Sequence, residues 1–232
     1  MKTKQLTFLL ALTFLFLFSG SSVVFGDGSD IYKGLGLQHA KDALKRQDYE
    51  TAYNILLPLG EREQGNPEVQ YEFGSLYLNS QGFLQDNKKA AKWFRLAAEQ
   101  GQANAQVSLG LIYDQGKGVP QNYKEALKWF RLAAKQGSAN AQSNMGMMYS
   151  DGLGVEQDYK EAVRWYRLSA DQGDATGQSN LGTMYENGWG VPQDYKEAVK
   201  WWRLSAGQRV EQAQYNLVLM HDDSLDYLNS PN

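Results

Sequence analysis

Apolar residues recur along this chain at helical spacing, in pairs of segments that return every 36 residues. In residues 102–137 the second segment has one apolar face, with members at i, i+3, i+4 and i+7: Ala126, Trp129, Phe130 and Ala133. The first segment has an apolar face at Ala105, Leu109 and Tyr113. This periodicity predicts two amphipathic helices per repeat, from about Ala103 to Gln115 and from about Tyr123 to Gln136.

Three columns of identical residues mark the repeat along the chain. They are the tryptophans Trp93, Trp129, Trp165 and Trp201, the glycines Gly74, Gly110, Gly146 and Gly182, and the tyrosines Tyr77, Tyr113, Tyr149 and Tyr185. A fixed period of this length is typical of a stacked-repeat solenoid, in which each helix pair packs mainly on its neighbours. We therefore expect an all-α solenoid of helix pairs, a fold that usually binds a partner along its long surface.

Glycines and capping residues recur where the helices meet and end. Gly110 costs its helix about 1 kcal/mol relative to alanine, and its recurrence in four repeats indicates that two helix backbones approach closely there. The other recurring signals are the turn glycines Gly116 and Gly118, the N-caps Asn122, Asp158 and Asp194, and the glycines that end the second helix, Gly101, Gly137 and Gly173.

The pattern divides the chain into a leader, an opening helix pair, four full repeats and a terminal segment. The opening pair spans residues 27–65, and the repeats span 66–101, 102–137, 138–173 and 174–209. In residues 210–232 one more helix of the first type runs to His221 and carries Val218 in the glycine column. Because no second helix follows it, we expect this segment to be a capping helix and a tail.

Residues 1–26 have the architecture of a secretory signal peptide. Lys2 and Lys4 precede an apolar run of 13 residues, and Val24 and Gly26 are small enough for the −3 and −1 cleavage positions. The run is shorter than the roughly 20 residues that a membrane span needs. We expect an exported protein, periplasmic or secreted, with no membrane insertion after cleavage. The alternative is a chain anchored in the membrane by an uncleaved N-terminal segment.

Charge and cysteine content exclude several classes of partner and chemistry. The chain has 23 Lys+Arg and 26 Asp+Glu, so without Lys2 and Lys4 the net charge is 21 − 26 = −5. This balance argues against nucleic acid, whose binding needs clustered positive charge, and against docking on anionic lipid. The chain has no cysteine, which removes disulfides, thiol nucleophiles and zinc–cysteine sites.

We find no catalytic constellation in the sequence and expect no cofactor or metal. The two histidines, His39 and His221, lie at opposite ends of the predicted solenoid, so they cannot share a metal ion. Asp114, Asp151 and Glu186 end the first helices of their repeats, where solvated charge is the default interpretation. The sequence therefore favours a protein that binds over one that reacts.

The repeat resembles the Sel-1-like repeat family, a branch of the tetratricopeptide-type helical solenoids. The resemblance rests on three motifs in order, as in Leu109-Gly110-x-x-Tyr113, Gly116-x-Gly118-Val119 and Lys124-Glu125-Ala126-x-x-Trp129, and it covers about residues 66–221. It implies a right-handed superhelix whose first helices line a concave groove. It also implies an adaptor in multiprotein assemblies, exported in several bacterial members. A cysteine-rich exported subgroup linked to β-lactam binding does not apply to a chain without cysteines.

Comparison of the repeats separates scaffold columns from candidate binding columns. The unchanged columns, predicted to join neighbouring repeats, are Gln70, Gln106, Gln142, Gln178 and Gln214, and Arg95, Arg131, Arg167 and Arg203. The columns that vary, which the resemblance places on the groove wall, are Tyr71, Val107, Ser143, Ser179 and Tyr215, and Ser75, Leu111, Met147, Thr183 and Leu219. Trp189 stands between two turn glycines, either folded over its own turn or exposed as an anchor for a partner.

These patterns lead to one functional hypothesis and two alternatives. We expect an exported, non-catalytic interaction module that holds a peptide or partner protein in the groove, with apolar contacts for affinity and polar side chains for register. One alternative is an envelope hydrolase whose site is assembled from carboxylates and tyrosines. The other is a host-contact or virulence factor of the same repeat family.

Overall fold

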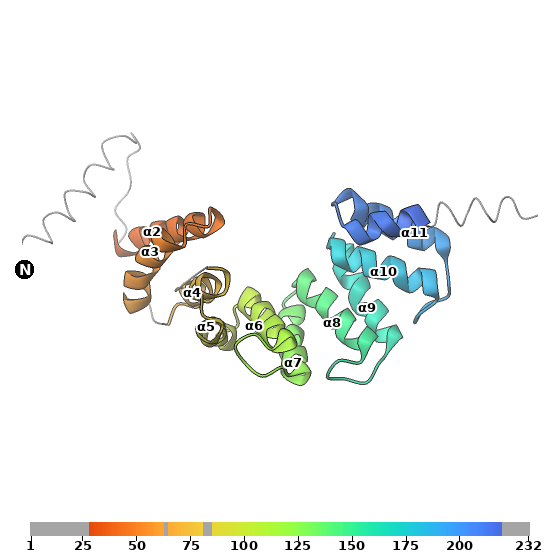
Figure 1. The fold of residues 1–232 in the computed structure, drawn as a ribbon, viewed down its shortest axis with the longest axis horizontal. Helices are drawn as coiled ribbons and strands as arrows, with labels where there is room; N and C mark the ends of the chain where they lie inside the picture. Colours follow the sequence, from red (N-terminus) through yellow and green to blue (C-terminus); the bar gives the residue numbers. More distant parts are fainter. Residues whose placement is uncertain (1–27, 63–64, 81–84, 220–232) are drawn as a thin grey trace, which may run out of the picture. The chain divides into compact units, whose positions relative to one another are not determined.

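The structure is a computed structural model that describes residues 28–62, 65–80 and 85–219 (Figure 1). The described residues are helical and contain no strand. The helices are α2 (Gly28–Lys45), α3 (Tyr49–Arg62), α4 (Pro67–Asn79), α5 (Asn87–Glu99), α6 (Ala103–Gln115), α7 (Tyr123–Lys135), α8 (Ala139–Asp151), α9 (Tyr159–Asp171), α10 (Ala175–Asn187) and α11 (Tyr195–Gly207). Residues 211–219 form a further helix.

The helices alternate between two types, as the periodicity predicts. We call α4, α6, α8 and α10 the A helices, and α5, α7, α9 and α11 the B helices. Each A helix packs on the B helix that follows it, and each B helix packs on the A helix of the next repeat. The predicted helix at Ala103–Gln115 is confirmed, and the predicted B helix ends one residue earlier than expected. The chain is an all-α solenoid, whose repeats lie within the compact unit Gly36–Asn232.

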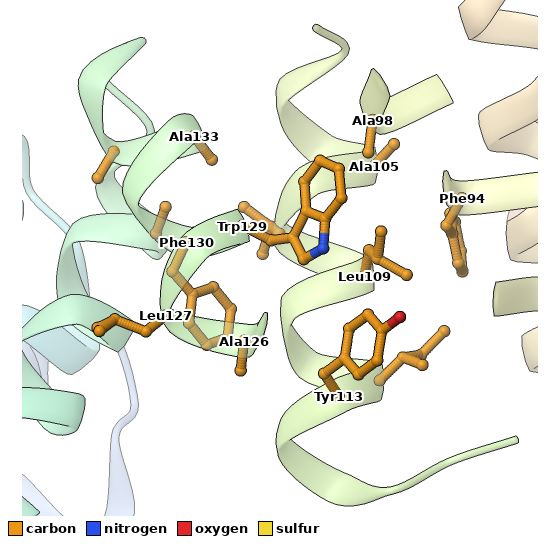
Figure 2. Close-up of a cluster of buried hydrophobic side chains, with 14 of the residues drawn as sticks. Phe94, Ala98, Ala105, Leu109, Tyr113, Ala126, Leu127, Trp129, Phe130 and Ala133 are labelled. Carbon is orange, nitrogen blue, oxygen red and sulfur yellow. The ribbon is translucent and has the colours of Figure 1, made fainter. Parts of the chain in front are cut away.

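The core runs between the two helix types through successive repeats (Figure 2). Trp129 and Phe130 project from α7 toward Leu109 and Tyr113 on α6, and all four side chains are buried. Met145 fills the position of Leu109 in the next repeat and is also fully buried. The predicted apolar faces are therefore the faces that form the core.

The column of A-helix glycines has a different cause from the one predicted. A Cβ on Gly110 would lie 2.5 Å from the ring of Phe130, and no backbone atom of α7 is among its nearest neighbours. The same ring position is filled by Phe94, Tyr166 and Trp202 in the other repeats, against Gly74, Gly146 and Gly182. The expectation that two helix backbones meet at this glycine is wrong, because an aromatic ring of the B helix occupies the space.

The second turn glycine joins neighbouring repeats. Gly118, with φ 74°, precedes α7, and a Cβ there would lie 2.4 Å from the backbone carbon of Asn87 at the start of α5. A Cβ on Gly154 would likewise lie 2.6 Å from the backbone carbon of Tyr123. A Cβ on Gly190 would lie 2.3 Å from the carbonyl oxygen of Tyr159. Each turn therefore rests on the first residue of the preceding B helix.

The helix ends have the predicted caps. The side chain of Asn122 accepts a hydrogen bond from the backbone N–H of Glu125, 3.1 Å away, and the Asp158 and Asp194 carboxylates cap α9 and α11 in the same way. After the B helices, Gly101 takes the left-handed conformation, with φ 89°. Arg209 occupies the same position after α11, with φ 67°, so the last repeat lacks the glycine that this conformation favours.

Some sequence predictions lie outside the described residues. These are the leader of residues 1–26, the end of the capping helix with His221, and the tail. Among the described helices none is both long and apolar enough to cross a membrane. In the described part of the last helix, Ala213 packs against Trp202, whereas Val218 in the glycine column is exposed.

Candidate partner-binding surface

The repeated glutamines form a ladder inside the scaffold. Gln142 on α8 donates to the Ala134 carbonyl of the preceding B helix, at 3.4 Å, and accepts from Gln172 at the end of α9, at 2.7 Å. Gln106 and Gln178 repeat both contacts, and Gln70 accepts from Gln100 at 2.8 Å. Gln106, Gln142 and Gln178 therefore each hold three helices together, as the scaffold interpretation predicts.

The repeated arginines connect each B helix to the next A helix. Arg131 on α7 donates to the Tyr149 hydroxyl of α8, at 3.4 Å. Arg95 donates to Tyr113 and Arg167 to Tyr185, and both guanidinium groups also lie over the tyrosine rings. Arg95, Arg131 and Arg167, like the glutamines, therefore join neighbouring repeats.

The first predicted binding column lies mostly beneath the surface. Val107, Ser143 and Ser179 are buried, so these three side chains offer little area to a partner. Tyr71 is half-buried, and its ring lies 5.6 Å from that of Phe94 on α5. Tyr215 is exposed. The column lies at the edge of the A helix that turns toward the B helix, which explains its loss of exposure.

The second predicted column reaches the surface. Its members Ser75, Leu111, Met147 and Thr183 are half-buried, and Leu219 is exposed. They lie on the outer face of successive A helices, which also contact one another directly, α4 with α6 and α8 with α10. Leu111 on α6 and Met147 on α8 are the half-buried apolar members of this column.

Two further columns share that outer face and escaped the sequence analysis. On α6, Asn104, Ser108, Leu111 and Gln115 fall at i, i+4, i+7 and i+11, all exposed or half-buried. The two columns that precede Leu111 are rich in side-chain amides: Asn104, Asn140, Asn144, Asn180, Gln212 and Asn216. Spacing of three and seven residues from Leu111 could have identified them. We call this solvent-facing surface of the A helices the A face.

The A face has no positive charge of its own. The four A helices contain no lysine or arginine. Their charged residues are Glu68, Glu72, Asp114, Asp151 and Glu186. The solvent-facing residues of the B helices include three basic columns, such as Lys124, Lys128 and Arg131 on α7, and an exposed leucine column, as at Leu132. Among these eight helices, the basic residues are therefore confined to the B helices, which also carry acidic residues such as Glu125.

A cavity of about 370 Å³ opens at the first-repeat end of the A face. The predicted residues Tyr71 and Ser75 line it, together with residues of α2, α3 and α6: Lys41, Leu44, Lys45, Tyr49 and Asn104. The cavity also contains Glu68, Glu72 and Asn79 from α4. The structure therefore brings two of the sequence-predicted residues into one hollow with charged groups that sequence reasoning did not select.

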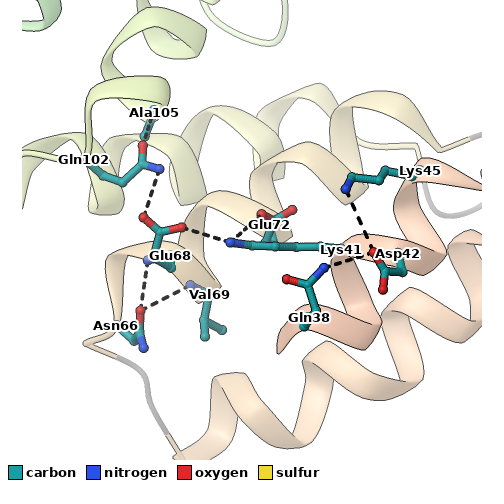
Figure 3. A network of polar contacts seen from close by, with 10 residues as sticks. All are labelled: Gln38, Lys41, Asp42, Lys45, Asn66, Glu68, Val69, Glu72, Gln102 and Ala105. Carbon is teal, nitrogen blue, oxygen red and sulfur yellow. Dashed lines mark hydrogen bonds and ion pairs between the residues drawn. The ribbon is translucent and has the colours of Figure 1, made fainter. Parts of the chain in front are cut away.

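An ion-pair network occupies one wall of this cavity (Figure 3). The ammonium group of Lys41 lies 3.2 Å from the Glu68 carboxylate and 3.8 Å from that of Glu72. Glu72 is only 7% exposed, and burial raises the pKa of its carboxyl group above the ordinary value, although Lys41 acts in the opposite direction. In the other repeats this position is Ser108, Asn144 or Asn180, so a buried carboxyl group is particular to the first repeat.

Trp189 contacts the preceding repeat. Its ring stacks on Tyr159 at the start of α9, with ring centroids 5.3 Å apart and planes 14° apart, and the residue remains 41% exposed. Neither proposed interpretation of this residue included a partner in the preceding repeat. The stacking reinforces the junction made by Gly190 on the same tyrosine, and leaves part of the indole accessible.

The described residues contain no group of acidic or histidine side chains that could hold a metal ion. Burial raises the pKa of the Asp114 carboxyl group, an effect that the sequence could not reveal. Asp114 stands at the end of α6, with its backbone carbonyl accepting from Gln121 at 2.7 Å. Because burial is the cause of the raised pKa, this shift alone does not define a catalytic pair.

Stacked helix pairs joined by glutamine and arginine ladders define a helical-repeat solenoid protein. The family model of the Sel1 repeat matches residues 67–102, 103–138, 139–174 and 175–209, and the chain belongs to the Sel1 repeat family. Sel1 repeat proteins generally mediate protein–protein interactions. A search of curated proteins gave no significant match.

Solved structures support the same assignment. A Sel1 repeat protein from Oxalobacter formigenes is 36% identical, with a TM-score of 0.70 over 78% of this chain and 72% of the other. A protective antigen of uropathogenic Escherichia coli with an SLR fold is 35% identical, with a TM-score of 0.72 over 85% of this chain and 43% of the other. A Sel1 repeat protein from Klebsiella pneumoniae, 16% identical with a TM-score of 0.55, shares the fold, over 82% of this chain and 93% of the other.

Proposed function

We propose that this protein is an exported, non-catalytic interaction module that binds a peptide or partner protein along the A face. One observation carries the proposal. The constant glutamine and arginine columns bond within the scaffold, whereas the variable column of Ser75, Leu111, Met147 and Thr183 reaches the surface of the A helices. A scaffold needs identical contacts at each junction, so variation at an exposed surface is expected where a partner is recognised.

The chemistry of the A face supports binding of a polypeptide. Side-chain amides such as Asn140 and Asn180 supply both donors and acceptors, which suit the N–H and C=O groups of an extended chain. Leu111 and Met147 add apolar contact, and methionine adapts to irregular partners. We expect the amides to fix the register of the partner and the apolar pair to provide most of the affinity.

Affinity capture from the native envelope fraction tests this proposal. A Leu111→Asp/Met147→Asp variant should lose a protein that the unaltered chain retains. The matched control is Leu132→Asp/Leu168→Asp, because these leucines are 39% and 44% exposed on the B helices. Circular dichroism verifies that both variants are folded. Equal capture by all three chains would reject the A face, and loss in the control alone would move the site to the B helices.

A role in host contact is the second candidate. The observation that favours it is the similarity to a protective antigen of uropathogenic Escherichia coli, of which this chain covers 43%. Recovery of the mature protein from culture supernatant would support this role, whereas retention in the periplasm would contradict it. The hydrolase alternative has no such support among the described residues.

A further inference from the structure

The outward face of every B helix carries the same line of three side chains. Its members fall at i, i+4 and i+8, so they follow one another along the helix, and all of them are exposed. Each line consists of two basic residues and a leucine: Lys88, Lys92 and Leu96 on α5, Lys124, Lys128 and Leu132 on α7, Lys160, Arg164 and Leu168 on α9, and Lys196, Lys200 and Leu204 on α11. We call these four lines the B stripes.

The first lysine of each B stripe does not contribute to the scaffold. In the part of the chain that the structure describes, the side chains of these lysines make no hydrogen bond or ion pair: Lys88, Lys124, Lys160 and Lys196. Each is the second residue of its helix, where the positive end of the helix macrodipole makes a cation unfavourable. Because folding does not account for a lysine at this position in four repeats, a function outside the fold is expected for it.

The second basic residue of three B stripes is already paired within its own helix. Lys128 lies 3.6 Å from the carboxylate of Glu125, and Arg164 lies 3.4 Å from that of Glu161. Lys200 pairs with Glu197 at 3.0 Å in the same way. The charge available to a partner therefore comes mainly from the first lysine of each stripe.

The leucine of each B stripe adds an apolar contact beside these charges. The four leucines are between 36% and 49% exposed: Leu96, Leu132, Leu168 and Leu204. Single exposed leucines are ordinary, but here the same residue recurs at the same position in every repeat. A column that neither varies nor bonds within the scaffold fits a partner that presents the same chemistry to successive repeats.

The charge of the B helices selects an acidic partner. The four B helices contain 14 lysines and arginines and five acidic residues, a net charge of +9. The four A helices contain five acidic residues and no basic residue. An acidic segment is therefore attracted to the B helices and repelled by the A helices, which gives it one preferred side of the repeat stack.

A polypeptide fits the B stripes better than a flat lipid surface does. Direct contacts between like helices are made by A helices, α4 with α6 and α8 with α10, whereas each B helix packs on A helices. The B helices therefore lie on the more open side of the stack. Since successive repeats of a solenoid are rotated relative to one another, a flexible chain can follow stripes that a plane cannot touch together.

We propose that the B stripes bind an acidic polypeptide segment with interspersed apolar side chains. Its carboxylates lie on the first lysines of successive B helices, and its apolar side chains lie on the leucines. This site is on other helices than the A face and does not depend on the proposed function. A protein with both sites holds two different partners at once, and repeated contacts with several stripes raise the affinity of the acidic one.

Fluorescence anisotropy with a labelled peptide tests the B stripes directly on the full chain. The probe repeats the sequence Glu-Asp-Leu-Glu, and the neutral control repeats Gln-Asn-Leu-Gln. We expect saturable binding of the acidic probe that weakens as the salt concentration rises, because exposed charges are screened. Equal binding of the neutral peptide, or no saturable binding of the acidic one, would overturn the inference.

A charge variant then identifies the lysines. Lys124→Gln/Lys160→Gln should weaken binding of the acidic probe by about tenfold, which corresponds to about 1.4 kcal/mol. This variant should remain folded, with an unchanged or higher melting temperature, because the two lysines bond to nothing within the protein. The matched control, Lys45→Gln/Arg46→Gln at the end of α2, removes the same charge elsewhere and should leave the affinity unchanged. Equal affinities of the two variants would refute the assignment.

A second variant tests the leucines through a matched peptide. The acidic probe is compared with a peptide that repeats Glu-Asp-Ser-Glu and so lacks apolar side chains. Leu132→Ser/Leu168→Ser should weaken binding of the leucine peptide and change binding of the serine peptide much less. An equal effect on both peptides would contradict contact between the leucines of the protein and the apolar side chains of the partner.

Two other occupants give distinct results with the lysine variant. Binding to phosphatidylglycerol vesicles that is lost in Lys124→Gln/Lys160→Gln would assign the stripes to a lipid surface and overturn the inference. Self-association that is lost in the same variant, measured by analytical ultracentrifugation, would assign them to the acidic A helices of a second copy and would also overturn it.

Failure of this inference is distinguishable from failure of the proposed function. The Leu111→Asp/Met147→Asp variant should bind the acidic probe normally, because the B stripes lie on other helices. Loss of the A-face partner in that variant, without any binding of the acidic probe to the unaltered chain, would reject the B-stripe inference alone. Probe binding that depends on the B-stripe lysines, without an A-face partner, would reject the proposed function alone.

Discussion

The ring of Phe130 lies directly against Gly110, so a Cβ on that glycine would come within 2.5 Å of the ring atom Cε1. Helix propensity alone would favour Gly110→Ala by about 1 kcal/mol. Overpacking of a filled core costs about 1–3 kcal/mol, so we expect the variant to lose about 1 kcal/mol and to melt at a lower temperature.

Gly207 provides the matched control for this substitution. It lies at the end of α11, and a Cβ there would meet no atom within 4 Å. Gly207→Ala should therefore leave the melting temperature unchanged or raise it. A higher melting temperature for Gly110→Ala would contradict the steric explanation of the glycine column.

The glutamine ladder predicts that Gln→Leu substitutions along its column lower the free energy of unfolding by unequal amounts. Gln142→Leu removes the acceptor of Gln172 and the donor to the Ala134 carbonyl, both in a buried junction. Polar groups left buried without a partner cost about 1–3 kcal/mol, and we expect a loss of that size in thermal or denaturant unfolding. Gln214→Leu, at the exposed end of the column, should cost much less. Equal losses would show that the ladder contributes little.

The conformation of Arg209 predicts a stabilising substitution. Its φ of 67° lies in the left-handed region, where the equivalent residues Gly101, Gly137 and Gly173 are glycines. A non-glycine residue in a sparsely populated region costs on the order of 1 kcal/mol. Arg209→Gly should therefore raise the melting temperature, measured by circular dichroism. A decrease would mean that the arginine side chain contributes more than the strain costs.

The buried carboxyl group of Glu72 predicts a pH-dependent difference in stability. Because burial raises its pKa above the ordinary 4.5, the folded state binds the proton more tightly than the unfolded state. The contribution of this group is fully present below about pH 4.5 and is lost as pH rises through the folded-state pKa. Glu72→Gln lacks this loss, so its melting temperature relative to the unaltered chain should be higher at pH 7 than at pH 3.5. A difference independent of pH would contradict the role of burial.

The sequence by itself determined the repeat, the two helices of each repeat and the faces that pack. It did so because periodicity of 3.6 residues and a fixed 36-residue period are local or internal signals, visible at Trp129 or Gln142 without any coordinates. It also assigned the glutamine and arginine columns to the scaffold, since identical junctions need identical contacts.

Only the tertiary structure decided what each repeated residue touches and which variable residues face outward. The sequence marks Gly110 as special, but whether a backbone or a ring lies opposite depends on how α7 packs on α6. Val107 and Leu111 differ by one helical turn and look equivalent in sequence, yet a small difference in direction buries the first and leaves the second half-buried. The cavity at Glu72 is formed by residues of α2, α3, α4 and α6, and their proximity follows from packing between helices rather than from any local signal.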